Sequence, residues 1–120
     1  MNVIVKDSVY DPSPSTAKSK IQVREEGGKT LYKVWLYLEG NDLAFIRNVT
    51  YRLHRTFPNP IMEVERSVSN PNCRAIIWTW GVFDVYVTIT DLKGHTYERI
   101  HRLTYVGEIE GEPRVNFQYV

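Results

Sequence analysis

Two short segments of this chain carry side chains that could act together in recognition. The first, Leu53-His54-Arg55-Thr56-Phe57-Pro58-Asn59-Pro60, contains an imidazole, a hydroxyl and an aromatic ring. The second, Trp80-Gly81-Val82-Phe83, places a tryptophan before a glycine, a residue that lets backbone turn sharply or come close to a ligand. If the segments meet, these groups gather at one place.

The residues on either side of both segments predict strands that end where the polar and aromatic groups begin. Val49, Tyr51 and Leu53 alternate with polar residues, the period of a half-buried strand. Proline cannot donate to a ladder, so Pro58 and Pro60 end this pattern and leave His54, Thr56 and Phe57 on a loop. Residues 73–78 predict the strand before Trp80, and residues 83–90 are the best alternating strand of the chain.

The remainder of the chain shows the same short β pattern. No stretch sustains a 3.6-residue period, and turn clusters recur regularly, which predicts an all-β, antiparallel sandwich of two sheets with seven to nine strands. We expect one domain over residues 1–120, a loop at Asp11–Thr16, a turn at Glu25–Lys29 and a single helical turn at Leu43–Ile46. The other strands are expected at residues 3–10, 21–24, 31–38, 47–53, 61–65, 95–105 and 115–119.

Composition narrows the class of partner. The chain has 120 residues, a net charge of +1, 42% hydrophobic and 24% charged residues, which suits one globular domain and excludes a disordered tail. Near-neutrality argues against nucleic acid as the main partner. Neither a signal peptide nor an apolar run of about 18 residues is present, so we expect no membrane insertion and a cytoplasmic location. Cys73 is the only cysteine, which rules out an internal disulfide.

Catalysis is the competing class of function. His54 could pair with Asp84 or Asp91 as an acid and base, but no nucleophile motif or phosphate loop accompanies them. The spacing of His95 and His101 does not form a metal signature. We therefore expect no enzyme activity, no metal and no cofactor. The two motifs also have packing interpretations: Phe83 begins an apolar face and is expected in the core, and Trp80 either caps the sandwich or lines a site.

Taken together, the motifs resemble those of a known family. Leu53-His54-x-Thr56-Phe57-Pro58-x-Pro60, Trp80-Gly81-x-Phe83 and the upstream segment of residues 34–40 are similar to a YEATS domain, above all to its prokaryotic branch. The resemblance covers about residues 31 to 105 and implies an immunoglobulin-like sandwich with its recognition loops at one end.

The resemblance also implies a function, the recognition of an acylated lysine (acetyl or crotonyl type) on a partner protein. Phe57 and Trp80 match the aromatic walls that stack on the flat acyl amide, an arrangement that suits a neutral planar group. Thr56 matches the residue whose hydroxyl pairs with the amide, and His54 matches the histidine that orients this hydroxyl. The backbone N–H of Trp80 matches the donor to the acyl carbonyl. Gly81 would let this backbone approach.

Two positions differ from the commoner pattern of that family. Val82 stands where the commoner eukaryotic pattern carries an acid or a glycine. Residues 25–30 lack the aromatic that some members place there, so Tyr32 is the nearest candidate for an additional aromatic. The alternative function is a protein–protein adaptor or signalling module that keeps the sandwich without acyl-lysine binding and uses a sheet edge or exposed Tyr86, Tyr97 and Tyr105. The sequence leaves the oligomeric state open.

Overall fold

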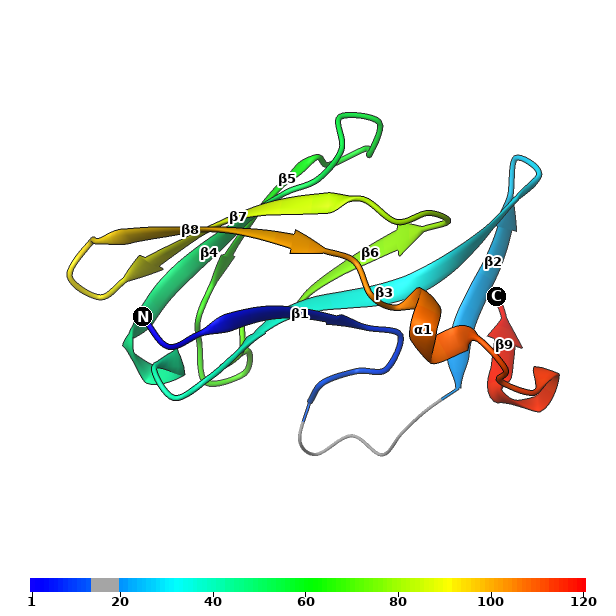
Figure 1. Ribbon diagram of the computed structural model, residues 1–120, viewed down its shortest axis with the longest axis horizontal. Coiled ribbons are helices and arrows are strands. Elements are labelled where there is room, and N and C mark those ends of the chain that lie inside the picture. Colours follow the sequence, from blue (N-terminus) through cyan, green and yellow to red (C-terminus); the bar gives the residue numbers. More distant parts are fainter. Residues whose placement is uncertain (14–19) are drawn as a thin grey trace.

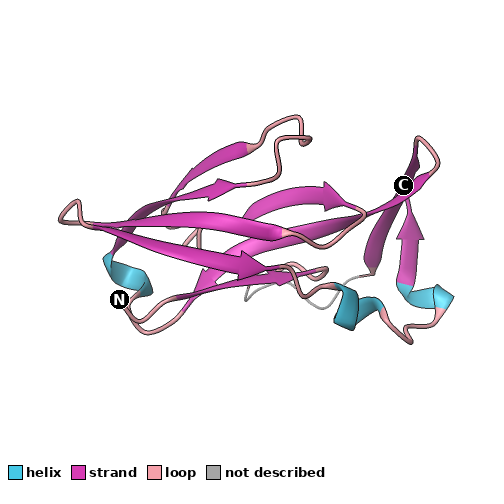
Figure 2. Cartoon of the chain, turned by 45° about the horizontal axis from the view of Figure 1, so that its top comes forward, coloured by secondary structure: helices cyan, strands magenta, loops and turns pink. Residues whose placement is uncertain are grey.

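The computed structural model describes residues 1–13 and 20–120, which form two β-sheets (Figures 1 and 2). The loop expected at Asp11–Thr16 lies partly outside the described residues. The first sheet contains β1 (Ile4–Ser8), β2 (Ile21–Glu26), β3 (Lys29–Glu39), β6 (Ala75–Thr79) and β9 (Phe117–Tyr119). The second has the order β5 (Ile61–Glu65), β4 (Ile46–Arg52), β7 (Asp84–Asp91) and β8 (Thr96–Arg102). Three short helices complete the description: η1 (Leu43–Phe45), α1 (Val106–Ile109) and η2 (Arg114–Asn116).

Alternating apolar residues place one face of each strand in a shared core. Successive side chains of a strand point to opposite faces, so Val34, Leu36 and Leu38 of β3 face inward together and are almost fully buried. Val85, Val87 and Ile89 of β7 do the same from the second sheet. Each such side chain stabilises the fold by about 1.5–3 kcal/mol. The expected all-β sandwich is thereby confirmed.

The long strand β3 brings the β2–β3 turn and the second candidate loop together at one end of the first sheet. β3 pairs with β1 through Trp35–Glu39 and with β2 through Lys29–Tyr32, while β6 pairs with it over residues 32–36. The β2–β3 turn and the β6–β7 loop therefore lie beside each other. In Figure 1 both lie to the right, and the β7–β8 hairpin lies far to the left.

The two sheets are also joined by a buried carboxylate. The Asp7 side chain on β1 is fully buried and lies 2.6 Å from Nε2 of His101 on β8. The backbone N–H groups of Thr104 and Tyr105 and the Thr104 hydroxyl also donate to it, at 2.8–3.0 Å. Because a buried charge is costly unless it is paired and hydrogen-bonded, these contacts make Asp7 a link between the sheets.

Three details of the chain differ from the expectations. β9 pairs with β2 in parallel, whereas every other strand pair of the described residues is antiparallel. The expected strand at residues 73–78 begins only at Ala75, because Cys73 has a φ of 52° and belongs to the preceding turn. Tyr105, expected as an exposed contact residue, is 1% exposed, so that expectation was wrong.

The two outermost strands on one side of the sandwich differ in charge. β6 pairs only with β3 and β5 only with β4 within the described residues, so each has an unpaired edge. β5 carries Glu63 and Glu65, whereas β6 consists of Ala75-Ile76-Ile77-Trp78-Thr79 and has no charged residue.

The helices of the described residues are short. None of them is long and apolar enough to cross a bilayer.

Candidate functional site

The first candidate loop is closed by backbone hydrogen bonds and arranges a histidine beside a threonine. Leu53 N donates to the Pro60 carbonyl at 2.7 Å, and Phe57 N donates to the His54 carbonyl at 3.0 Å. Within this turn His54 Nδ1 lies 2.9 Å from the Thr56 hydroxyl, and Thr56 N donates to the same nitrogen at 3.3 Å. Both side chains are exposed.

The direction of the threonine hydroxyl depends on the tautomer of His54. In the tautomer with its proton on Nε2, Nδ1 accepts from both the backbone N–H and the hydroxyl of Thr56. The lone pairs of Thr56 Oγ1 are then left to accept from another group. An amide N–H is a suitable donor for them.

The second candidate loop exposes a tryptophan on a firmly held backbone. The side chain of Trp80 is 60% exposed. The next residue, Gly81, accepts from the Tyr105 hydroxyl at 2.9 Å and from the buried Thr79 hydroxyl at 3.2 Å through its carbonyl. Burial raises the pKa of Tyr105, in keeping with a hydroxyl that stays protonated and donates. The indole thus projects from a fixed position.

The two loops meet through their phenylalanines. The ring centroids of Phe57 and Phe83 are 5.1 Å apart with an interplanar angle of 52°. Both side chains are partly buried and pack against the core, which agrees with the packing role expected for Phe83. Trp80 has a different neighbour: Lys29 Nζ lies 4.2 Å from the centroid of its ring.

Cavities lie on both sides of the first loop. One, of about 340 Å³, is lined by Leu53 and Phe57 of the first loop, by Met62 of β5, and by Leu31, Ile76 and Trp78 of the first sheet; Trp80 does not line it. Another, of about 450 Å³, is lined by His54, Leu53, Arg55, Phe83, Asp84 and Tyr86. The ring of Phe57 therefore has open space beside it.

The remaining candidate site residues differ in their surroundings. A Cβ on Gly81 would meet no atom within 4 Å, so the space in front of this backbone is open. Val82 is 39% exposed at the tip of the loop. Tyr32 lies opposite Thr79 on β3, and its ring centroid is 6.1 Å from that of Tyr105, beneath the loop.

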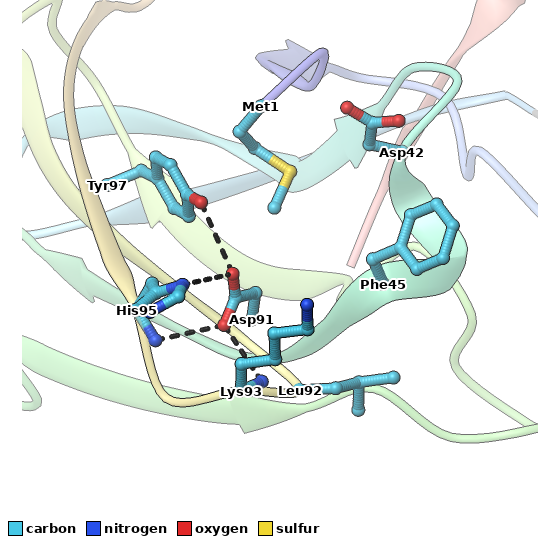
Figure 3. Close-up of a pocket in the computed structure, with 8 residues that line it drawn as sticks. All are labelled: Met1, Asp42, Phe45, Asp91, Leu92, Lys93, His95 and Tyr97. Carbon is cyan, nitrogen blue, oxygen red and sulfur yellow. Dashed lines mark hydrogen bonds and ion pairs between the residues drawn. The ribbon is translucent and has the colours of Figure 1, made fainter.

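Residues considered for acid–base or metal chemistry are engaged elsewhere. Asp84 lines a cavity together with His54, but its carboxylate lies 3.2 Å from Arg102. Asp91 lies at the opposite end of the sandwich, where it accepts from the backbone of Lys93 and His95 beside a cavity of about 460 Å³ (Figure 3). His101 contacts Asp7. Within residues 1–13 and 20–120, no group of three or more possible ligands is placed to hold a metal ion.

Sequence reasoning missed the residues that support the site. Thr79 and Tyr105 hold the Trp80 loop, and Lys29 covers a face of the indole. A threonine two residues before a glycine is typical of a local side-chain turn and could have indicated the role of Thr79. Nothing near Tyr105 in the sequence points to a residue 24 positions earlier.

Comparison with known structures agrees with this fold. The structure is similar to a Yaf9 YEATS domain in a structure described as recognising an H3K122suc peptide (TM-score 0.59, 18% identity, 90% of this chain and 74% of that chain). A second Yaf9 YEATS structure, bound to H3K27ac, gives a TM-score of 0.51 with 17% identity over 85% of this chain and 73% of that one. The yeast AF-9 homologue Yaf9 in a further structure gives 0.52 with 18% identity over 86% and 69%. At these identities the likeness shows the fold.

The sequence comparisons give the family. No curated protein sequence matches the chain. The model of the prokaryotic YEATS domain matches residues 31–104, which include both candidate loops and the strands that carry them. With its two-sheet sandwich and this match over more than half of its length, the chain belongs to the prokaryotic YEATS domain family.

Proposed function

We propose that this domain is a non-enzymatic reader that binds acylated lysine, or a similar planar amide, on a partner protein in the cytoplasm. The ligand would enter between Phe57 and Trp80, a place that we call the loop-end slot. The observation that carries the proposal is the indole of Trp80, which is 60% exposed although the backbone beside it is held by buried groups. An exposed aromatic ring on a firmly held backbone provides the flat surface on which a planar group can stack.

The chemistry of the slot suits an amide. A planar, neutral amide stacks well on aromatic faces, whereas the ammonium of an unmodified lysine would have to shed its water. Thr56 Oγ1, with its hydrogen directed to His54, would accept from the amide N–H. The backbone N–H of Trp80 would donate to the acyl carbonyl, and the open space in front of Gly81 would admit it. Polar partners of this kind favour an amide over a hydrocarbon of similar size.

The proposal is tested by titrating acetyl- and crotonyl-lysine peptides, and the same peptide unmodified, against four proteins. We expect the wild type to bind only the acylated peptides. Trp80→Ala should weaken binding about five- to thirtyfold, because a stacked ring in a binding site contributes about 1–2 kcal/mol. Thr56→Val, which removes the hydroxyl at nearly constant volume, should weaken it by a similar factor.

Thr96→Val is the matched control, since Thr96 is exposed on β8 at the far end of the sandwich. Circular dichroism and melting temperature establish that the variants fold. Equally negligible binding by wild type and Trp80→Ala would reject the reader and favour the adaptor. In that second function the docking surface would be an exposed row across the second sheet, where Ile61, Arg52, Tyr86 and Ile100 are consecutive cross-strand neighbours.

A further inference from the structure

The free edge of β6 borders a cavity. Within the described residues β6 pairs only with β3, so no strand lies beside the N–H and C=O groups of its other edge. The cavity of about 340 Å³ is lined by Ile76 and Trp78 on the outer face of this strand and by Ile77 on the inner face. A cavity that reaches both faces of an outermost strand lies along its free edge. Its volume is at the lower end of the range of ligand pockets, about 300–1,000 Å³, and suits one large side chain.

The lining of this cavity is mostly apolar. Besides the residues of β6, it includes Leu53 and Phe57 of the first candidate loop and Met62 of β5. The charged residues of the lining, Arg24 and Glu26, lie 3.1 Å apart and pair with each other. An apolar group is therefore the one that gains most from entering the cavity, because it leaves water without breaking an ion pair.

The edge of β5 beside the cavity is acidic. Glu63 and Glu65 follow Met62, are exposed, and form no ion pair within the described residues. The arginines that follow β5 and precede β6 are engaged elsewhere: Arg66 donates to a backbone carbonyl at 2.9 Å, and Arg74 lies 4.0 Å from a carboxylate. A lysine or arginine that arrives beside β5 would therefore meet two carboxylates without an ion-pair partner.

These charges decide between a partner segment and a second copy of this chain. Antiparallel pairing of β6 with β6 of a second copy would also turn the two β5 edges toward each other, and like charges across an interface oppose association. A basic segment instead gains from the same glutamates. The position also suits a segment, because β6 ends directly before Trp80 and Phe57 belongs to the first candidate loop, so that the edge continues the candidate site.

We propose that the free edge of β6 binds an extended segment of a partner protein as an added strand. One large apolar side chain of the segment enters the cavity, and a lysine or arginine two positions away lies beside Glu63 and Glu65. Residues two apart on a strand point to the same face and are about 7 Å apart, which matches an apolar cavity next to an acidic edge. Hydrogen bonds between the backbones hold the segment, and the two kinds of side chain select its sequence. An acylated lysine is not required for this contact.

Two short peptides of equal composition test the selection. Both are capped threonine–serine peptides with a central phenylalanine. In the first, arginines stand two positions before and after the phenylalanine; in the second, they stand directly before and after it, on the opposite face of a strand. We expect the wild type to bind the first about two- to fivefold more tightly by fluorescence anisotropy, the factor that an exposed ion pair contributes.

Two changes locate the contributions. In the Glu63→Gln/Glu65→Gln protein the ratio between the two peptides should approach one, because the carboxylates are gone. Replacing the phenylalanine of the first peptide by alanine should weaken its binding to the wild type about tenfold or more, since the cavity then stays empty.

Ile76→Lys tests the edge itself, because a charged side chain on an edge strand opposes the addition of another strand. It should weaken the binding of both peptides about tenfold or more. Ile4→Lys is the matched control: Ile4 lies on β1 of the same sheet and is 55% exposed, compared with 47% for Ile76. This variant should bind like the wild type. Circular dichroism and melting temperature establish that both variants fold.

Three results would overturn the proposal: no binding of either peptide, equal binding of the two by the wild type, or binding that survives Ile76→Lys. A wild-type dimer in sedimentation experiments that Ile76→Lys dissociates would also overturn it, because the edge would then belong to a second copy. None of the peptides carries an acylated lysine, so each of these results leaves the reader function intact.

Discussion

At the scale of single residues, the arrangement around Trp80 separates a fixed backbone from an exposed side chain. Thr79 and Tyr105 are both buried and both donate to the Gly81 carbonyl. A side chain whose backbone is already ordered loses less conformational freedom when a ligand binds. On the side of the tryptophan, the backbone is thus already ordered, which favours the proposed function.

Cys73 offers a test of the interior at this scale. Burial raises the pKa of its thiol to about 11, with a smaller opposing effect of Arg66, and the side chain is 0% exposed. The thiolate is the reactive form, so iodoacetamide at pH 8 should not label the folded protein and should label it rapidly in urea. Mass spectrometry after timed quenching measures the rate.

A second cysteine provides the comparison. In a Cys73→Ala background, Val68→Cys places a thiol at a fully exposed position. This variant should react quickly without urea. If wild-type Cys73 reacted as fast as this exposed thiol, the burial described for the turn before β6 would be refuted.

The sequence predicted residues whose contacts are local and missed those whose contacts are distant. His54 and Thr56 are two positions apart on one turn, so their hydrogen bond follows from a short motif. Lys29 reaches Trp80 only because β2, β3 and β6 are neighbours in the sheet. Tyr105 was expected at the surface, at the end of a strand over residues 95–105, whereas β8 ends at Arg102 and Tyr105 is buried. The role of each residue in binding stays a prediction.

At the scale of elements, the end of β3 depends on one glycine. Gly40 has a φ of 148°, and a Cβ there would collide with the Asn2 carbonyl oxygen and lie 2.9 Å from Val3 Cα. Gly40→Ala should lower the free energy of unfolding by more than about 2 kcal/mol, because the N-terminal segment would have to move and a strained backbone would remain. Urea denaturation followed by fluorescence measures the change.

Gly107→Ala serves as the control for this substitution. Its φ is not in the positive region, a Cβ there meets no atom within 4 Å, and alanine favours the short helix α1. We expect no loss of stability from it. A Gly40→Ala protein as stable as Gly107→Ala would mean that the N-terminal segment does not pack against the end of β3 in solution.

Strands with an alternating pattern were predicted well, and pairings were not. Residues 83–90 and 61–65 gave β7 and β5 nearly at their observed limits, because the period of two is a local property. The parallel pairing of β9 with β2 joins segments about 95 positions apart and has no local signal. The same holds for α1, since the Gly107–Pro113 stretch was interpreted only as a break in the pattern.

At the scale of the whole molecule, Asp7 connects the two sheets on the side of β1 and β8. In Asp7→Asn one carboxylate oxygen becomes an NH2 group, so some of the N–H and O–H donors around it lose their acceptor, and an unsatisfied buried polar group costs about 1–3 kcal/mol. Asp7→Asn should therefore destabilise the protein by an amount in this range, measured by urea denaturation.

Asp84→Asn is the matched control, because Asp84 forms a more exposed ion pair with Arg102 at 3.2 Å. Exposed pairs contribute at most about 1 kcal/mol, so this change should be small. Similar costs for the two substitutions would contradict the central place given to Asp7.

The uncharged edge of β6 has a consequence for the behaviour of the domain at high concentration. Ile76 is 47% exposed on this strand, and the unpaired backbone beside it can add a further strand from a neighbouring molecule. The glutamates of β5 repel such an addition on the adjacent edge. Aggregation at high concentration, and any fibrils formed on long storage, should accordingly begin by strand addition at residues 75–79.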